Sequence, residues 1–199
     1  MSPLRCDRHR CFRRRQERRD AQAGAGRQNG GCGVAHRCAR FDYRQLTRLP
    51  APHFQILSVR EVGSRIEQLM RPQLAQAGIT LRLDISPESL EVTADPEQLE
   101  QVLINLLTNA LQALEGQAGG RIALRGRMDG RGRVLVEVED NGPGIVPEAL
   151  EKVFIPFFTT KPEGSGIGLS LCQQIMRLHR GTITARSRPG EETVFGLRF

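Results

Sequence analysis

The chain of 199 residues has no tryptophan, a single tyrosine and no long apolar run. A helix that crosses a bilayer needs roughly 20 consecutive apolar residues, and no stretch approaches that length. The N-terminal stretch is polar and rich in arginine, so it lacks the apolar segment of a secretory signal. Hydrophobic residues make up 39% of the chain, as in soluble globular proteins. We therefore expect a cytoplasmic domain with no membrane contact by this segment.

Beyond residue 40 the chain has a single cysteine and no excess of positive charge. Four of the five cysteines lie in residues 1–40, and Cys172 is expected to be a small buried residue of a helix. Residues 1–40 carry 11 arginines and three acids, a formal charge of +8, whereas residues 41–199 carry 18 basic and 19 acidic residues, a charge of −1. The net charge of +7 thus belongs to the leader, and nucleic acid is not expected as a partner of the rest. This cysteine usage requires no oxidising compartment.

Residues 1–40 lack helical and strand periodicity and have few large apolar side chains, so we expect a disordered leader. Three interpretations stay open. The leader is a basic tail that touches nucleic acid or membrane, a zinc site built from its four cysteines with His9 or His36, or a stretch that is not a selected protein segment. The cysteine spacings are wider than the close pairs usual in zinc sites. We favour the third interpretation, a misassigned start or a frame-shifted leader.

From residue 58 onward the apolar residues follow regular periods. Helical spacing predicts a helix over 58–78, strict alternation predicts a half-buried strand over 79–85, and a turn at 86–89 lets the chain return as a strand. Asp95 before Pro96 is typical of a helix start, and this helix is expected to end near Leu114. The other predicted elements are strands at 90–94, 121–128 and 133–139, helices at 146–153 and 167–178, and strands at 182–187 and 193–199.

The order of these elements predicts the fold class. It is helix, two strands, helix, two strands, loop, helix and two strands, without an internal repeat. Strands that follow each other through short connections pair mostly antiparallel, and the amphipathic helices must bury their apolar stripes. We therefore expect an α+β two-layer sandwich with a mixed, mainly antiparallel sheet and helices on one face.

Two asparagines lie on one face of the helix that begins at Pro96. Asn105 and Asn109 are four residues apart, so their side chains project in the same direction. Asparagine is a poor helix former, and its amide oxygen is a suitable hard ligand for Mg²⁺. The opposing interpretation is that both are solvated helix residues.

Asp140 lies where a strand ends and a glycine loop begins. Its carboxylate could accept a hydrogen bond from the exocyclic amine of adenine, and Gly142 and Gly144 would let the backbone approach the ring. The pattern is also that of an ordinary turn, and the two interpretations carry equal weight.

A second glycine cluster leads into the helix at 167–178. Gly164, Gly166 and Gly168 would present backbone N–H groups and a helix N-terminus to phosphates. The chain has only eight phenylalanines, yet three fall within 154–158. That segment could hold the edge of a lid over a nucleotide with Lys161 near the phosphates, or it could merely anchor a loop.

Together these motifs resemble the catalytic ATP-binding domain of sensor histidine kinases, in the same superfamily as gyrase, Hsp90 and MutL. The resemblance covers residues 56–199. Residues 105–110 are similar to the asparagine box, 140–144 to the first glycine box, 154–158 to the phenylalanine box and 164–168 to the second glycine box, while Thr193 and Phe195 resemble the closing Thr-x-Phe element.

The resemblance implies a Bergerat sandwich that binds ATP and Mg²⁺. Asn109 is then the metal ligand and Asp140 the adenine reader, and Asn105, Asn109 and Lys161 are the expected catalytic residues. The expected nucleotide-binding set is Asn109, Asp140, Gly142, Gly144, Phe158, Thr160, Lys161, Gly164, Ser165, Gly166, Ile167, Gly168, Leu169 and Thr193.

One position argues for a kinase rather than a hydrolase. The ATPase relatives have a glutamate that activates water at the first polar position of the asparagine box. This chain has Asn105 there, and an amide cannot act as a base. Because phosphoryl transfer depends mostly on positioning and charge stabilisation, such a site would hold ATP for another acceptor.

The chain departs from the family at the phosphoacceptor. The resemblance implies an upstream histidine followed by an acid and then proline, and neither His9, His36 nor His53 has that context. Residues 41–55 resemble the end of a dimerisation hairpin and its linker. His179 resembles a family histidine that precedes two glycines, although Arg180 replaces the first, and we expect His179 to be structural.

The leading hypothesis is thus transfer of the γ-phosphoryl group to a histidine, on a dimerisation domain in cis or in trans, with a response regulator receiver domain as partner. Without an acceptor histidine the chain could be inactive alone. A nucleotide-binding regulatory module without phosphotransfer and a serine kinase of the anti-sigma type remain as alternatives.

Overall fold

The computed structural model describes residues 49–161 and 164–199; the interpretations of residues 1–40, and most of the remnant expected at 41–55, lie outside this part. In chain order the elements are β1 (Gln55–Ser58), α3 (Val59–Ala77), β2 (Thr80–Ile85), β3 (Glu91–Ala94), α4 (Pro96–Ala113), β4 (Arg121–Met128), β5 (Val134–Asp140), α5 (Pro147–Leu150), α6 (Gly168–Leu178), β6 (Thr182–Arg188) and β7 (Glu192–Arg198). None of the helices in the described ranges has the length and apolar character required to cross a bilayer.

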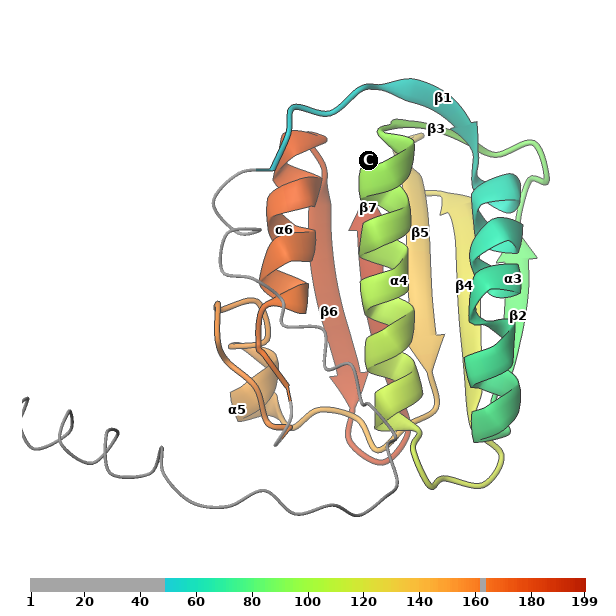
Figure 1. Cartoon of the computed structure of the whole chain (residues 1–199). Coiled ribbons are helices and arrows are strands. Elements are labelled where there is room, and N and C mark those ends of the chain that lie inside the picture. Colours follow the sequence, from blue (N-terminus) through green and yellow to red (C-terminus); the bar gives the residue numbers. More distant parts are fainter. Residues whose placement is uncertain (1–48, 162–163) are drawn as a thin grey trace, which may run out of the picture. The chain divides into compact units, whose positions relative to one another are not determined.

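Five strands form one sheet in the order β2-β4-β5-β7-β6. β2 pairs parallel with β4, and the other neighbours pair antiparallel. Helices α3, α4 and α6 lie side by side over one face of this sheet (Figure 1). The predicted α+β class, with a mixed and mainly antiparallel sheet covered by helices on one side, is confirmed.

The sequence missed β1 and the partner of β3. These two short strands pair antiparallel as a separate ladder, with Gln55 opposite Ala94. Residues 90–94 therefore do not return beside β2, because β2 pairs with β4 instead. A strand of four residues is too short to show an alternation, so its existence depends on the partner that the fold brings to it.

The short helix predicted over 146–153 is wrong in extent. It covers only Pro147–Leu150, and turns follow. The residue before it, Val146, has no side-chain oxygen to cap the first N–H groups. A helix without a cap and with few residues gains little against the cost of nucleation.

The core lies between the sheet and the three helices. Inward-facing Val136 and Val138 of β5 and Ile122 and Leu124 of β4 are each 1% exposed. They meet the apolar stripe of α4, whose fully buried members are Val102, Leu103, Leu106 and Leu107. Cys172 of α6 is also fully buried, and burial raises the pKa of its thiol to about 12, as expected for a packing residue.

The N-terminus of α4 is held by contacts from three parts of the chain. Asp95 Oδ1 caps the helix by accepting from the Gln98 N–H at 2.9 Å, and Oδ2 accepts from the His53 N–H at 2.7 Å. The Asp95 N–H donates to His179 Nε2 at 3.0 Å, so the ring proton sits on Nδ1, which donates to Ile175 O at 2.8 Å. Both ring nitrogens of the buried His179 are therefore engaged, in agreement with a structural role.

The turn after His179 has an arginine in a backbone conformation that is unusual for a residue other than glycine. Arg180 adopts φ +55° at the end of α6, and the Gly181 N–H donates to Met176 O at 2.8 Å. This is the left-handed conformation that normally favours glycine after a helix. Arg180 therefore forms the same turn that a glycine would form, and its strained backbone conformation costs free energy.

Asp95→Ala is expected to lower the free energy of unfolding by about 1–2 kcal/mol, because it removes the cap of α4 and the acceptor for His53. Burial opposes ionisation of Asp95, but the N–H groups of Gln98, His53 and Glu97 outweigh it and lower the pKa of the carboxyl. The stabilisation should thus be present near neutral pH and be lost in acid. Urea unfolding of wild type and Asp95→Ala at two pH values measures this; an undiminished difference in acid would contradict the capping argument.

Candidate functional site

Asp140 is the last residue of β5, and its side chain points to the helix side of the sheet. It lies opposite Ile122 of β4 and Thr193 of β7, and it is 3% exposed. Oδ1 accepts from the Gly142 N–H at 3.0 Å. Burial raises the pKa of Asp140 to about 6, against the opposite effects of that hydrogen bond and of the Lys161 charge, while the Glu139 charge adds to the rise. The structure thus provides a desolvated carboxylate with a second oxygen for a ligand.

Lys161 connects the segment after the phenylalanine box to helix α4. Its Nζ donates to Gln112 Oε1 at 2.9 Å and to the Asn109 main-chain oxygen at 3.4 Å. Burial lowers the pKa of Lys161, and the charges of Asp140 and Glu115 act in the opposite direction. This side chain therefore brings the predicted metal ligand and the predicted adenine reader into one neighbourhood.

Asn105 of the asparagine pair faces the start of α6. Its Nδ2 atom is buried, interacts with the Cys172 thiol and has no oxygen or nitrogen acceptor among the residues that the structure describes. A Cβ on Gly168 would lie 3.6 Å from Asn105 Oδ1, so the first residue of α6 packs directly against this amide. Ile167, the residue before the helix, provides no side-chain cap, and the first turn carries no acid. Within the described part of the chain, the N–H groups of this first helical turn therefore have no side-chain cap.

The first glycine loop packs closely on the β6–β7 turn. Gly144 has φ +74°, and a Cβ there would lie 2.6 Å from Arg188 O. The Ile145 N–H donates to Ser187 Oγ at 2.8 Å, and this hydroxyl lies 3.1 Å from Thr193 Oγ1. Gly144 is thus required by a backbone contact, and the loop is more than an exposed turn.

The second glycine cluster folds back on the phenylalanine box. Gly166 has φ +67°, and a Cβ there would lie 2.5 Å from the carbonyl carbon of Phe157. The Phe157 N–H donates to Gly166 O at 2.9 Å. Phe154 packs edge-on against Phe195 of β7 with a centroid distance of 6.5 Å. The segment is therefore anchored at Phe154, while Ile155 and Phe157 are more than half exposed.

Contacts bring part of the predicted set together. Lys161 contacts the main chain of Asn109, and its charge interacts with that of Asp140. Thr193 is buried beside Asp140, and Asn105 packs against Gly168. The remaining predicted residues, Phe158, Thr160, Gly164, Ser165, Ile167 and Leu169, lie in or just after the segment that folds over Gly166. Their contact with a nucleotide stays a prediction.

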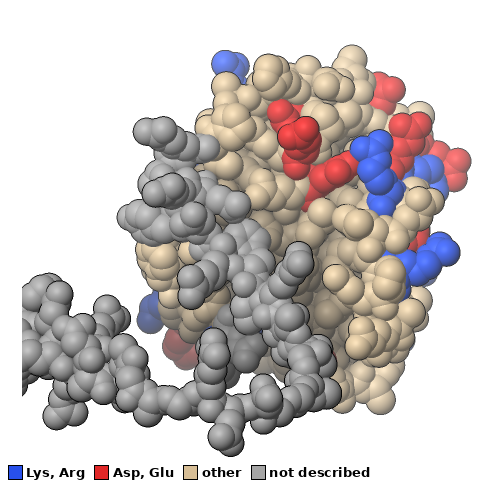
Figure 2. All heavy atoms as spheres, in the orientation of Figure 1, with Lys and Arg blue, Asp and Glu red and all other residues tan. Residues whose placement is uncertain are grey.

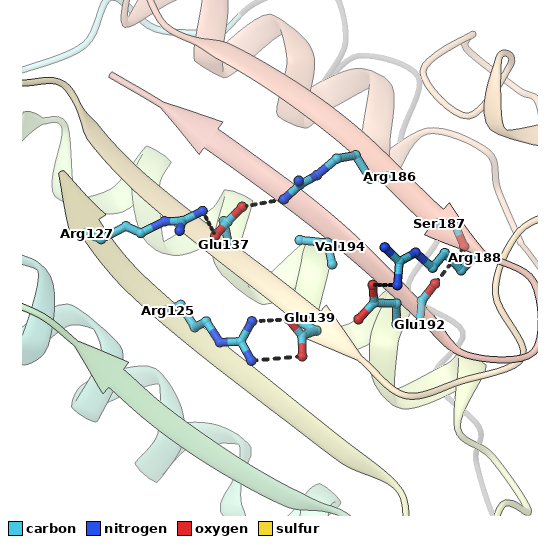
Figure 3. Close-up of a pocket in the computed structure, with 9 residues that line it drawn as sticks. All are labelled: Arg125, Arg127, Glu137, Glu139, Arg186, Ser187, Arg188, Glu192 and Val194. Carbon is cyan, nitrogen blue, oxygen red and sulfur yellow. Dashed lines mark hydrogen bonds and ion pairs between the residues drawn. The ribbon is translucent and has the colours of Figure 1, made fainter. Parts of the chain in front are cut away.

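A cavity of about 350 Å³ lies elsewhere, on the sheet face away from the helices (Figure 3). It is lined by arginine and glutamate side chains and includes no residue of the predicted set. Within the described ranges no three His, Cys, Asp or Glu side chains gather into a metal site. An Mg²⁺ at Asn109 would take its other ligands from water and phosphate, which is the usual arrangement for this ion.

Sequence reasoning missed three residues that support the site. Gln112 accepts from Lys161, and its position one helical turn after Asn109 could have indicated this. Asn141 Oδ1 accepts from the Arg121 N–H at 2.6 Å, and the Asn141 main-chain oxygen accepts from Gln117 Nε2 at 2.8 Å, which ties the loop after α4 to the first glycine loop. Ser187 has no local signal, because its role depends on the β6–β7 turn meeting residue 145.

Known proteins are similar to this chain in sequence and fold. A family model described as histidine kinase-, DNA gyrase B- and HSP90-like ATPase matches residues 94–199. The sensor histidine kinase ZraS of Klebsiella oxytoca is 38% identical over 151 residues, 76% of this chain and 32% of that protein. This chain thus spans about a third of the length of the curated relatives it matches first.

Solved structures agree. The nucleotide-free catalytic domain of histidine kinase ThkA superposes with a TM-score of 0.66 at 34% identity, covering 74% of this chain and 95% of that one. Histidine kinase ThkA in complex with the response regulator protein TrrA gives a TM-score of 0.63 at 32% identity, covering 73% of this chain and 41% of that one.

Gly144→Ala should disrupt the first glycine loop, because the new methyl group meets the Arg188 carbonyl and the backbone must keep φ +74°. We expect a loss of about 2–3 kcal/mol in the free energy of unfolding. Gly130→Ala is the matched control: nothing lies within 4 Å of its Cβ position, and its φ is not in the left-handed region. Thermal denaturation compares the two; equal losses would remove the argument for a required close contact.

Asp140→Asn should stabilise the ligand-free protein above pH 6, because it removes a charge from a buried site. With the folded pKa raised to about 6, the ionised carboxyl costs up to roughly 3 kcal/mol above that pH and nothing below its unfolded value. The gain should thus grow from about pH 4 to 6 and then stay constant. Chemical denaturation across this range measures it, and a variant less stable than wild type at about pH 8 would contradict the desolvation argument.

Proposed function

This chain belongs to the family of histidine kinase-, DNA gyrase B- and HSP90-like ATPases, as a catalytic domain of the sensor histidine kinase type, and we propose that it binds Mg·ATP and transfers the γ-phosphoryl group to a histidine. The single observation that supports the chemistry is Lys161, a partly desolvated ammonium whose charge acts on the buried Asp140 carboxylate and whose Nζ contacts the main-chain oxygen of Asn109.

Asp140 would read the adenine. Gly142 occupies one carboxylate oxygen, so the other is available to the exocyclic amine. At a site that is 3% exposed, water competes poorly for this oxygen, and a base without the amine would leave a buried charge unpaired. This is why one hydrogen bond can select a purine with an amino group.

The phosphates would be held by the second glycine cluster and the beginning of α6. The uncapped N–H groups at Gly168 and the helix dipole favour negative charge there. The buried Asn105 Nδ2, which has no oxygen or nitrogen acceptor in the described residues, is a donor at the same place. Lys161 would add its positive charge on the side of Asn109.

Asn109 would hold Mg²⁺ through its side-chain oxygen, a ligand type that suits this ion. When bound, the metal would supply positive charge that offsets the negative charge developing during transfer. Asn105 supplies no base for water, so the site holds ATP intact until an acceptor side chain arrives. Positioning and charge stabilisation are then the work of this domain.

The acceptor is expected to lie on a histidine-bearing dimerisation domain, in cis or in trans. His179 is excluded because it is buried and both ring nitrogens are engaged. A relative, ThkA, has been solved in complex with the response regulator protein TrrA. By analogy we infer a receiver domain as the final acceptor, and we expect this chain to act in the cytoplasm.

Two binding measurements separate the roles of the two key residues. Asp140→Asn should weaken ATP binding by about 10- to 100-fold with or without Mg²⁺, because the adenine contact does not involve the metal. Asn109→Ala should weaken it only when Mg²⁺ is present. Calorimetric titration of ATP with Mg²⁺ or with EDTA tests both, and unchanged affinity of Asp140→Asn would remove the assignment of the adenine reader.

Transfer itself is tested with γ-labelled ATP and a histidine-bearing dimerisation domain from a relative. The expected product is labelled on that domain and is labile in acid, as a phosphohistidine is. An acid-stable product would instead support a serine kinase of the anti-sigma type. Tight ATP binding with no labelled product would support a regulatory nucleotide-binding module.

A further inference from the structure

The sheet face away from the helices is covered by arginine. Alternation along the five strands directs seven arginines and four acids outward, a formal charge of +3. The arginines are Arg82, Arg121, Arg125, Arg127, Arg186, Arg188 and Arg198, and the acids are Asp84, Glu137, Glu139 and Glu192. The other described residues carry nine basic and 13 acidic side chains, a charge of −4. Charge is therefore segregated between this face, here called the arginine face, and the rest of the domain.

The opposite side of the domain looks different. Figure 2 shows the helix side, where acidic and basic side chains mix at the α3 edge and most of the described surface is uncharged. Positive and negative side chains are thus distributed unevenly between the two sides of the domain. The excess of positive charge comes from β4, which has three outward arginines, and β6, which has two, whereas β2 and β7 each have one arginine and one acid.

The arginine face is hollowed over β5, β7 and β6. Its cavity of about 350 Å³ has Val194 among its lining residues, with four arginines around it (Figure 3). Gly196 of β7 lies between Glu137 of β5 and Thr184 of β6. A Cβ on Gly196 would lie 3.1 Å from Thr184 Oγ1 and 3.8 Å from Glu137 Cγ. The missing side chain leaves room for a bridge between β5 and β6 across β7.

That bridge fixes two arginines in place. Glu137, whose side chain is 6% exposed, accepts from Arg127 Nη2 at 2.7 Å and from Arg186 Nη2 at 2.8 Å. Each guanidinium offers several N–H donors in a rigid planar fork. Arg127 and Arg186 give one nitrogen each to Glu137 and remain 54% and 68% exposed. Oriented donors are therefore available without the entropic cost of ordering two free side chains.

Arg188 is more exposed than Arg127 and Arg186. Its side chain is 73% exposed, and its nearest acidic oxygens, on Glu191 and Glu192, lie 3.6 and 3.8 Å away. These separations are too long for hydrogen bonds. Arg186 and Arg188 are two residues apart on β6 and so project from the same side of the sheet. A carboxylate could take a forked pair of hydrogen bonds from either one.

We propose that the arginine face docks an acidic protein segment, whose carboxylates bind the free donors of Arg127, Arg186 and Arg188. The four acids of the arginine face would repel a continuous phosphate backbone, and no aromatic side chain points outward from these strands to stack a base. A protein surface with separate acids matches such a mixed pattern, and arginine is enriched at protein interfaces. The docking surface lies across the sheet from Asp140, so a partner could bind without covering the nucleotide.

A labelled oligoglutamate peptide at low salt serves as the probe, with fluorescence anisotropy as the readout on the full chain. Arg186→Gln with Arg188→Gln should weaken binding about 5- to 10-fold, because two exposed carboxylate contacts are lost. Arg127 continues to neutralise the buried Glu137 in this variant. ATP affinity, measured on the same samples, should not change.

Arg65→Gln with Arg177→Gln is the matched control, since it removes the same charge from exposed positions of α3 and α6. It should change peptide binding by less than about twofold. Should the first double variant unfold, Arg188→Glu alone reverses the charge of the most exposed of these three arginines and should weaken binding about tenfold.

Three results would overturn the proposal. One is equal weakening in both double variants, which would mean that only net charge matters. Another is no peptide binding by wild type at low salt. The last is tighter binding of a single-stranded oligonucleotide of equal charge, which would assign this face to nucleic acid.

Discussion

The position of helix α4 over the sheet is the constraint on which the rest of this domain depends. Its apolar stripe fills the centre of the core, its N-terminus is fixed by Asp95 and His179, and its C-terminal half receives Lys161. Because the helix is held at both ends, Asn105 and Asn109 keep fixed positions relative to Asp140 on β5. Transfer to an acceptor needs this kind of preorganisation more than it needs a catalytic base.

A second consequence of this packing is the burial of Asp140. A carboxylate at the end of a central strand loses most of its hydration, and one N–H and a nearby ammonium offset only part of the cost. The free energy of unfolding of the ligand-free domain is therefore lower than it would be with a neutral side chain at position 140. In the proposed role of Asp140, the same desolvation would make the remaining oxygen a strong acceptor for a nucleotide, so the cost and the specificity would have one origin.

Successive side chains of each strand point to opposite faces of the sheet, so one face is apolar and the other is charged. Inward residues of β4, β5 and β7 form the core and, at the strand ends, the proposed nucleotide site. Outward residues form a charged lattice in which Glu137 and Glu139 each lie against arginines of neighbouring strands. A change such as Gly196 to a larger residue would alter the outer face first, since the glycine sits under the bridge between Glu137 and Arg186. The two faces therefore differ in chemistry although the same strands form both.

The sequence by itself determined the class of fold, the order of its main elements and the boxes that identify the family, because periodicity, caps and glycine motifs are local properties. Asp95 before Pro96 begins α4 as predicted, and Asp140 ends β5 as predicted. Only the tertiary structure decided that β3 pairs with β1, that Ser187 holds residue 145, that Lys161 reaches Gln112, and that seven arginines share one face. Each of these depends on segments distant in sequence meeting in space, and a pattern read along one chain contains neither the partner nor the register that brings them together.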